Sequence, residues 1–149
     1  MKKEIKNEWT YEQSPKEVWA YLTQAELIAQ WLMPNTFKAI PGYEFQFNSG
    51  PIPSMDLDGI FHCTIIEIVP YQKLVYTWKG GPGNGVITLD TVVEWTLQKQ
   101  GEGTKLSIKQ SGFKESNYTI FTAMTAGWQE HALKMMKLLN EGENDNGTV

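Results

Sequence analysis

Apolar residues near the end of the chain recur at gaps of three and four, the spacing of one face of a helix. The pattern covers residues 118–141 and follows Asn117 and Ser116, either of which can cap a helix N-terminus. Gly142 is the residue type that most often ends a helix, so we expect residues 143–149 to form a disordered tail. About 24 helical residues span roughly 36 Å, a length that needs a wide partner surface. The apolar face comprises Phe121, Met124, Trp128, Ala132, Met135 and Leu139.

The start of the chain predicts one strand followed by two short helices. Residues 3–11 alternate between apolar and polar, as in a half-buried strand, and Asn7 shares the inward face with aromatic neighbours. Ser14 opens a Ser-Pro-Lys-Glu sequence that is typical of a capped helix start. Thr23, with a glutamate three residues later, predicts a second N-cap, and Pro34 bars continuation of that second helix.

The middle of the chain alternates with a period of two residues and predicts a mostly antiparallel sheet. The loop 49–58 is unusually apolar, so we expect it to fold over another part of the molecule. The glycine-rich stretch 80–85 lacks the Gly-Lys-Ser/Thr ending of a phosphate-binding loop and is interpreted as a hairpin loop. The expected strands cover residues 36–40, 43–48, 59–69, 73–79, 87–97 and a last segment around Leu106 and Ile108. With helices before and after these strands, the order predicts an α+β protein with one domain over residues 1–142.

Composition and charge narrow the possible partners. The 149 residues carry a net charge of −4, so no basic field favours nucleic acid. No apolar run approaches the ~20 residues of a membrane span, and a cytoplasmic protein is the simplest interpretation. The chain contains six Trp, six Tyr and six Phe, more than a core of this size requires. This aromatic surplus favours a surface that also contacts a ligand.

No catalytic constellation is visible in the sequence. His62 and His131 are isolated and lack the spacing of a zinc site, and we interpret His131 as a partly exposed helix residue rather than a general base. Cys63, the single cysteine, excludes an internal disulfide and is expected to be a small buried hydrophobe. We therefore expect no metal and no cofactor.

A series of short motifs carries a resemblance to a known fold. The motifs are Ser14-Pro15-x-x-Val18-Trp19-x-x-Leu22-Thr23, Leu27-Ile28-x-x-Trp31, Gly59 before a strand ending in Val69-Pro70, Lys73-Leu74-Val75-Tyr76-Thr77-Trp78, Gly103-Thr104-x-Leu106 and Gly127-Trp128. In this order the chain resembles the helix-grip, or START-like, fold from residue 3 to about 140. Within that fold it is similar to the branch related to the C-terminal domain of the Hsp90 ATPase activator. The wider superfamily (SRPBCC) includes polyketide cyclases and Bet v 1-type proteins.

The resemblance implies a curved antiparallel sheet wrapped around the long C-terminal helix, with an apolar cavity between them. The two short helices would close one end of the cavity. Asn7 and Gln110 are the polar members of the expected lining, and for both a structural hydrogen bond is the commoner role. The expected ligand-binding residues are Asn7, Trp9, Tyr11, Phe45, Phe47, Tyr76, Trp78, Gln110, Phe121, Met124, Trp128 and Met135.

Three functional hypotheses follow. The first is a carrier, sensor or sequestering protein that binds a small hydrophobic, aromatic or lipid-like molecule without chemistry of its own. The second is a cochaperone-like domain that acts on an Hsp90-type ATPase through its surface. The third is a cyclase- or dehydratase-type enzyme with a Tyr or His in the cavity as acid or base. Both a monomer and a homodimer are compatible with the sequence.

Overall fold

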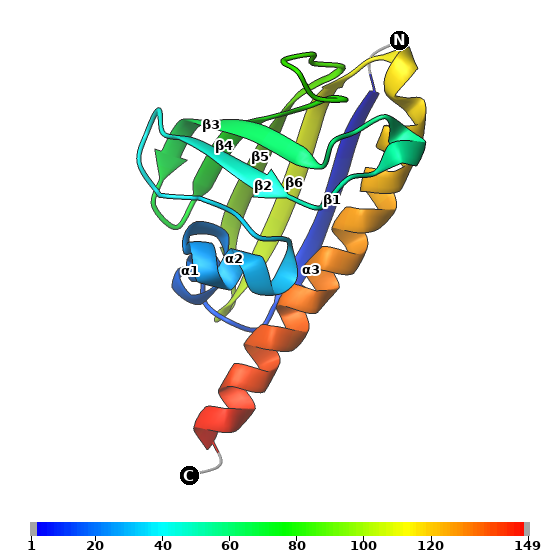
Figure 1. The fold of residues 1–149 in the computed structure, drawn as a ribbon. Helices are drawn as coiled ribbons and strands as arrows, with labels where there is room; N and C mark the ends of the chain where they lie inside the picture. Colours follow the sequence, from blue (N-terminus) through cyan, green and yellow to red (C-terminus); the bar gives the residue numbers. More distant parts are fainter. Residues whose placement is uncertain (1–2, 148–149) are drawn as a thin grey trace.

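The computed structural model of the chain describes residues 3–147 and contains one six-stranded antiparallel sheet (Figure 1). The strands lie in the order β1-β6-β5-β4-β3-β2, so the first strand pairs with the last. The strands are β1 (Lys3–Tyr11), β2 (Glu44–Asn48), β3 (Ile60–Val69), β4 (Lys73–Gly80), β5 (Leu89–Gln100) and β6 (Gly103–Phe113). The helices are α1 (Pro15–Thr23), α2 (Ala25–Trp31) and α3 (Tyr118–Gly147), with 3-10 turns η1 (Pro53–Met55) and η2 (Glu115–Asn117).

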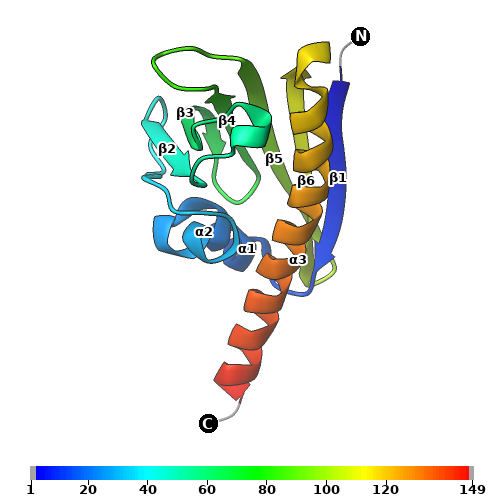
Figure 2. The ribbon, with the colours of Figure 1, turned by 45° about the vertical axis from the view of Figure 1, so that its right-hand side comes forward.

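The arrangement is the helix-grip fold expected from the sequence. The sheet curves, and α3 runs along its β1 and β6 side (Figures 1 and 2). The short helices α1 and α2 lie at one end of the sheet, where Figure 2 shows them beside the middle of α3. The α+β class, the two short helices after the first strand and the long C-terminal helix are all confirmed.

Of the N-caps predicted for the two short helices, one is present. The Ser14 hydroxyl accepts a hydrogen bond from the Glu17 backbone N–H at 3.3 Å, which caps α1 as expected. The second cap was predicted wrongly, because Gln24 is the N-cap of α2 and makes no side-chain cap bond. The Thr23 hydroxyl instead donates to the Trp19 carbonyl oxygen one turn back, which removes it from any capping role.

The predicted strand over residues 36–40 is also wrong. Only one isolated bridge, between Asn35 and Phe47, forms in this region. The side chains compete with a ladder here, because the Asn35 Oδ1 accepts from the Phe37 N–H and the Thr36 hydroxyl accepts from the Gln46 N–H. Residues 36–40 therefore do not form a strand paired with β2.

The last helix is longer than predicted. We expected Gly142 to end it, but α3 continues to Gly147. A glycine ends a helix when it adopts a positive φ, and Gly142 is not among the residues with positive φ. Gly142 instead lies within the helix, away from its ends, and is exposed to solvent. Residues 148–149 lie outside the described part of the chain.

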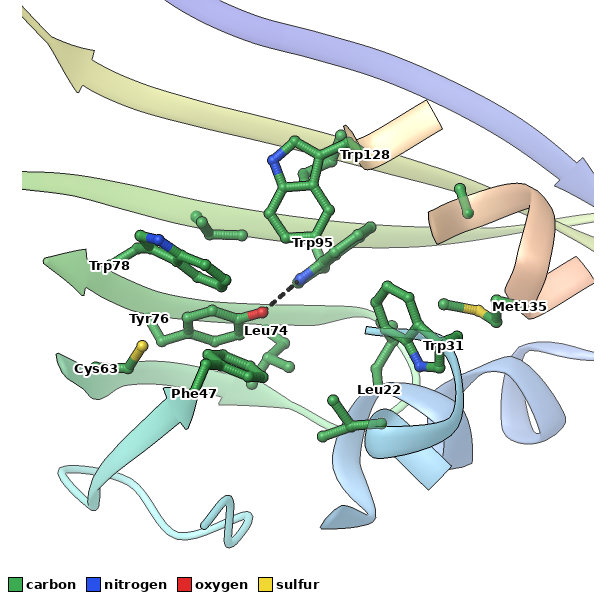
Figure 3. Packing of buried hydrophobic residues seen from close by; sticks show 14 of the residues in the cluster. Leu22, Trp31, Phe47, Cys63, Leu74, Tyr76, Trp78, Trp95, Trp128 and Met135 are labelled. Carbon is green, nitrogen blue, oxygen red and sulfur yellow. Dashed lines mark hydrogen bonds between the residues drawn. The ribbon is translucent and has the colours of Figure 1, made fainter. Parts of the chain in front are cut away.

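Large aromatic side chains dominate the core between sheet and helices. Trp95 on β5 makes edge-to-face contacts with Trp31 of α2 and Trp128 of α3, at centroid distances of 6.0 and 5.4 Å. Its indole N–H donates to the Tyr76 hydroxyl at 3.0 Å (Figure 3). Aromatic contacts of this geometry stabilise a core by more than the burial of their apolar area alone. Here they connect the sheet with α2 and α3.

Candidate ligand-binding cavity

An apolar cavity of about 240 Å³ lies between α3, the end of α2, strands β3 and β4 and the loop 49–58. None of the residues that line it is an acid, a lysine or an arginine. Its lining comprises Leu32, Met33, Ser49, Ile52, Met55, Leu57, Phe61, Trp78, Ile120, Ala123, Met124, Gly127, Trp128 and His131. A cavity with this lining suits a largely apolar, uncharged ligand.

The sheet contributes two aromatic rings to the cavity wall. Trp78 on β4 contacts Phe61 on β3 at a centroid distance of 5.0 Å and stacks against Phe47 on β2 at 4.8 Å. Trp128 of α3 meets Trp78 edge to face at 5.6 Å. The Trp78 indole nitrogen is buried and has no hydrogen-bond partner among the described residues. The aromatic rings of this wall are therefore closely packed, and the Trp78 indole N–H is a hydrogen-bond donor without a partner among the described residues.

A buried polar network fixes Trp128 in its orientation. Its indole N–H donates to the Gln110 Oε1 at 2.8 Å, and the Gln110 amide donates to the Thr91 hydroxyl at 3.0 Å. The Thr91 hydroxyl donates in turn to the Trp78 carbonyl oxygen at 2.8 Å. Gln110 is fully buried, so these bonds satisfy groups that would otherwise be costly to bury. Gln110 supports the cavity wall from behind and does not line it.

The loop 49–58 covers the cavity from the side opposite the sheet. Ile52 and Leu57 exchange backbone hydrogen bonds across η1, which directs apolar side chains inward. Gly59 closes the loop with a φ of +87°, and a Cβ there would lie 2.0 Å from the Gly50 carbonyl oxygen. Only glycine fits such an approach. The loop therefore folds over the cavity, as its apolar composition predicted.

His131 is the one histidine that lines the cavity. Its Nδ1 lies 2.9 Å from the Trp31 carbonyl oxygen at the end of α2. Burial lowers the pKa of His131, partly opposed by the Trp31 carbonyl and by Glu130, whereas Lys134 lowers it further. The imidazole is thus held against α2 and favours its neutral form.

The structure brings three of the twelve predicted binding residues to this cavity: Trp78, Met124 and Trp128. The other predicted binding residues lie behind or beside the cavity. Phe45, Phe47 and Tyr76 form an aromatic cluster in the core. Phe121 packs against Phe113 of β6, and Met135 is buried near Trp31 (Figure 3).

The predicted polar residues of the first strand serve the β1–α3 contact. Asn7 faces α3, as expected, but its side chain is exposed and donates to the Gln129 Oε1 at 3.2 Å. The Trp9 indole N–H donates to the same oxygen at 2.8 Å. The Tyr11 hydroxyl donates to the Ala132 carbonyl oxygen at 2.8 Å. Near the edge of a sheet the inward face is only partly covered, so alternation alone placed Asn7 too deep.

Burial holds three further ionisable groups in their neutral forms. Desolvation raises the pKa of Tyr11, of Tyr76 and of the Cys63 thiol. None of the three lines the cavity. Within residues 3–142, no three His, Cys, Asp or Glu side chains gather into a potential metal site. No helix in the described part of the chain is long and apolar enough to cross a bilayer.

Several lining residues were missed by the sequence analysis. Leu32 and Met33 follow α2 directly, and Phe61 is one of several apolar residues on β3, so only the packing of distant segments reveals their role. The loop residues Ile52 and Met55 gave a usable signal, because apolar side chains in a loop need cover. His131 lies three residues after Trp128 on α3, which placed it at the border of the inward face.

Comparisons with known proteins agree with this architecture. A model of the family described as Activator of Hsp90 ATPase homolog 1-like protein matches residues 12–140. Protein MLL2253 from Mesorhizobium loti is 29% identical with a TM-score of 0.82, over 93% of this chain and 98% of that one. CalU16 from Micromonospora echinospora is 18% identical with a TM-score of 0.72, over 93% of this chain and 74% of that one.

A further similar structure is DynU16, from the dynemicin biosynthetic locus. It is 21% identical with a TM-score of 0.73, and the match covers 93% of this chain but 48% of DynU16. At these identities CalU16 and DynU16 show a shared fold. No curated protein matches the chain.

Proposed function

This chain belongs to the family of Activator of Hsp90 ATPase homolog 1-like proteins, and from that premise we propose that it binds a small, neutral aromatic molecule in the cavity between α3 and the sheet. The observation that carries this proposal is the cavity itself, which is apolar, lined by aromatic and Met side chains and free of charged residues in its lining. Wide aromatic and thioether surfaces adapt to flat apolar ligands.

The size of the cavity selects among apolar ligands. Drug-sized sites measure roughly 300–1,000 Å³, whereas an engineered cavity of about 150 Å³ binds benzene. A volume of about 240 Å³ therefore favours one ring or two fused rings over a sterol or a long acyl chain. Of the two ligand classes considered from the sequence, the aromatic one fits better than the lipid-like one.

A carrier or sensor role ranks above catalysis. His131 is the one ionisable residue in the described lining, and the Trp31 carbonyl oxygen orients its imidazole as a general base would require. A cyclase or dehydratase would also need a second acid–base group in place, and the described lining offers no second ionisable group. Conversion of a bound aromatic ketone or polyketide-like model compound, followed by chromatography, would reverse this ranking.

The family description keeps a cochaperone role as the second candidate. It names activation of the Hsp90 ATPase, a property of the activator that this chain would share only through its surface. The direct test is the ATPase rate of a purified Hsp90-type chaperone with and without this protein. A rate increase that does not depend on cavity residues would favour the cochaperone role over ligand binding.

The experiment that tests binding is a thermal-shift titration with naphthalene, indole, a C16 fatty acid and a sterol. A ligand at about 100 times its Kd adds roughly 2.7 kcal/mol to the free energy of unfolding. For a domain of this size that corresponds to a Tm increase of about 5–10 °C. We expect this increase with the bicyclic aromatics and not with the sterol. No shift with any of the four compounds would contradict the proposal.

The variant Gly127→Ala separates ligand binding from folding. Gly127 lines the cavity in the interior of α3, and a Cβ there would meet only His131, at 4.0 Å. The methyl group should raise the stability of the free protein by up to about 1 kcal/mol, because alanine favours the helix. It should also weaken naphthalene binding several-fold, because it occupies part of the cavity.

The matched control is Gly142→Ala on the same helix. A Cβ at Gly142 meets nothing within 4 Å, and the residue is exposed and remote from the cavity. This substitution should leave naphthalene affinity unchanged. Equal affinities of both variants and the parent protein would show that naphthalene binds elsewhere.

A further inference from the structure

We infer that the ligand carries a hydrogen-bond donor, such as a phenolic hydroxyl, and that Nε2 of His131 accepts it. This inference rests on the proposed function and adds a polar group, with its position, to an otherwise apolar ligand. It makes His131 a specificity-determining residue of the cavity.

The tautomer of His131 follows from its neighbour. A backbone carbonyl oxygen can only accept a hydrogen bond, so the 2.9 Å contact with the Trp31 oxygen requires the proton on Nδ1. In the neutral imidazole the second nitrogen, Nε2, then has a lone pair and acts as an acceptor. The end of α2 thus determines which group the cavity presents to a ligand.

The acceptor is accessible from the cavity. His131 is half-buried and belongs to the lining together with Gly127, whose added Cβ would lie 4.0 Å from Nε2. No hydrogen-bond partner of Nε2 occurs among the described residues. An acceptor beside a confined apolar volume is costly to desolvate without a partner, so a ligand that supplies a donor gains over one that does not.

The other groups near the cavity favour a neutral donor over a charged one. Ser49 already donates its hydroxyl to the Gly50 carbonyl oxygen at 2.9 Å. The charged residues that act on His131 are Glu130 and Lys134. Both are exposed on α3, and neither lines the cavity. A ligand ammonium or carboxylate would therefore be buried without a counter-charge. A phenol or an indole-like N–H avoids that cost.

The test compares 2-naphthol with naphthalene and 2-methoxynaphthalene by isothermal titration at pH 7.5. These compounds share the aromatic body, but only 2-naphthol can donate a hydrogen bond. We expect the protein to bind 2-naphthol about tenfold more tightly than either comparator, the effect of one buried hydrogen bond. His131→Phe should lose this preference while it still binds naphthalene.

Two controls keep the outcome decisive. His62→Phe removes the other histidine, which is exposed on β3, and should retain the tenfold preference. If His131→Phe does not fold, as judged by circular dichroism, His131→Leu replaces it, because leucine also lacks a hydrogen-bond acceptor and should lose the preference for 2-naphthol in the same way. Equal affinity of the parent protein for all three compounds would overturn the inference and leave the proposed function intact. If none of the three binds, the proposed function itself fails.

Discussion

At the scale of single residues, Trp78 and Trp95 show that equal burial does not mean equal contribution. Both indoles are fully buried, with exposed fractions of 1% and 0%. The Trp95 N–H donates to the Tyr76 hydroxyl, whereas the Trp78 N–H has no partner among the described residues. Burial of an unpaired donor costs free energy, whereas the paired donor contributes to stability.

This difference predicts the effect of two matched substitutions. Trp95→Phe and Trp78→Phe remove the same volume from the core, but only Trp95→Phe breaks a hydrogen bond. We expect Trp95→Phe to lower the free energy of unfolding by about 1–2 kcal/mol more than Trp78→Phe. Urea unfolding followed by circular dichroism measures both values. Equal losses would mean that the Tyr76 hydroxyl readily finds another partner.

His131 gives stability a dependence on pH. Its pKa in the folded protein is lowered below the ordinary value of about 6.5, mainly by burial. Between the two pKa values the unfolded chain binds more protons, so the free energy of unfolding rises with pH in that window. The contribution is complete above about pH 6.5 and is lost as the pH falls toward the folded-state pKa.

The corresponding prediction concerns the slope of stability between pH 5.5 and 7.5. His131→Gln should reduce this slope by up to about 1.4 kcal/mol per pH unit, the value for one proton. Urea titrations at four pH values provide the measurement, with His62→Gln as the matched control. A slope that His131→Gln leaves unchanged would show that His131 titrates alike in the folded and unfolded chains.

At the scale of elements, the caps predicted for the two short helices behave differently in the structure. Ser14 caps α1 through the Glu17 N–H, while the Thr23 hydroxyl bonds back to Trp19 inside the same helix. The sequence pattern was similar in both cases, because a short polar residue precedes a glutamate by three positions. The shared residue pattern could not reveal that α1 extends to Thr23 and leaves Gln24 to begin α2.

These caps make a paired prediction. Ser14→Ala should lower the free energy of unfolding by about 1 kcal/mol, the usual cost of a lost N-cap. Thr23→Ala should change it by no more than about 0.5 kcal/mol, because alanine favours the helix and no cap is lost. Thermal unfolding of both variants distinguishes the roles. A larger loss for Thr23→Ala than for Ser14→Ala would contradict the assignment.

At the scale of the whole molecule, the sequence predicted the fold well and the cavity only in part. Periodicity located α3 and the long strands because each buries one face. Of the residues expected to bind a ligand, Trp78, Met124 and Trp128 line the cavity, although periodicity alone left the inward face of the later strands open. Alternation cannot tell which inward residues meet empty space and which meet other side chains. Phe45 and Tyr76 share the inward pattern of Trp78 yet pack inside the core.

The remaining cavity residues come together only through tertiary structure. His131 acquires its tautomer from the carbonyl group of Trp31, a residue far away in sequence. Ile52 and Met55 reach the cavity because Gly59 allows the loop to close on Gly50. Such contacts depend on backbone geometry between segments that share no periodic signal. The residues that complete the cavity are therefore those that the sequence pattern identified least well.

The pairing of β1 with β6 has a consequence for protein synthesis. Asn7 lies opposite Ile108 in the register, so the first strand must wait for nearly the last strand before the sheet can form. At about 5–20 residues per second the ribosome needs on the order of 5–20 s to deliver the intervening chain. Throughout that interval Ile5, Trp9 and Tyr11 lack the partners that later bury them. Until β6 has been synthesised, β1 is therefore an unpaired strand whose apolar side chains are exposed.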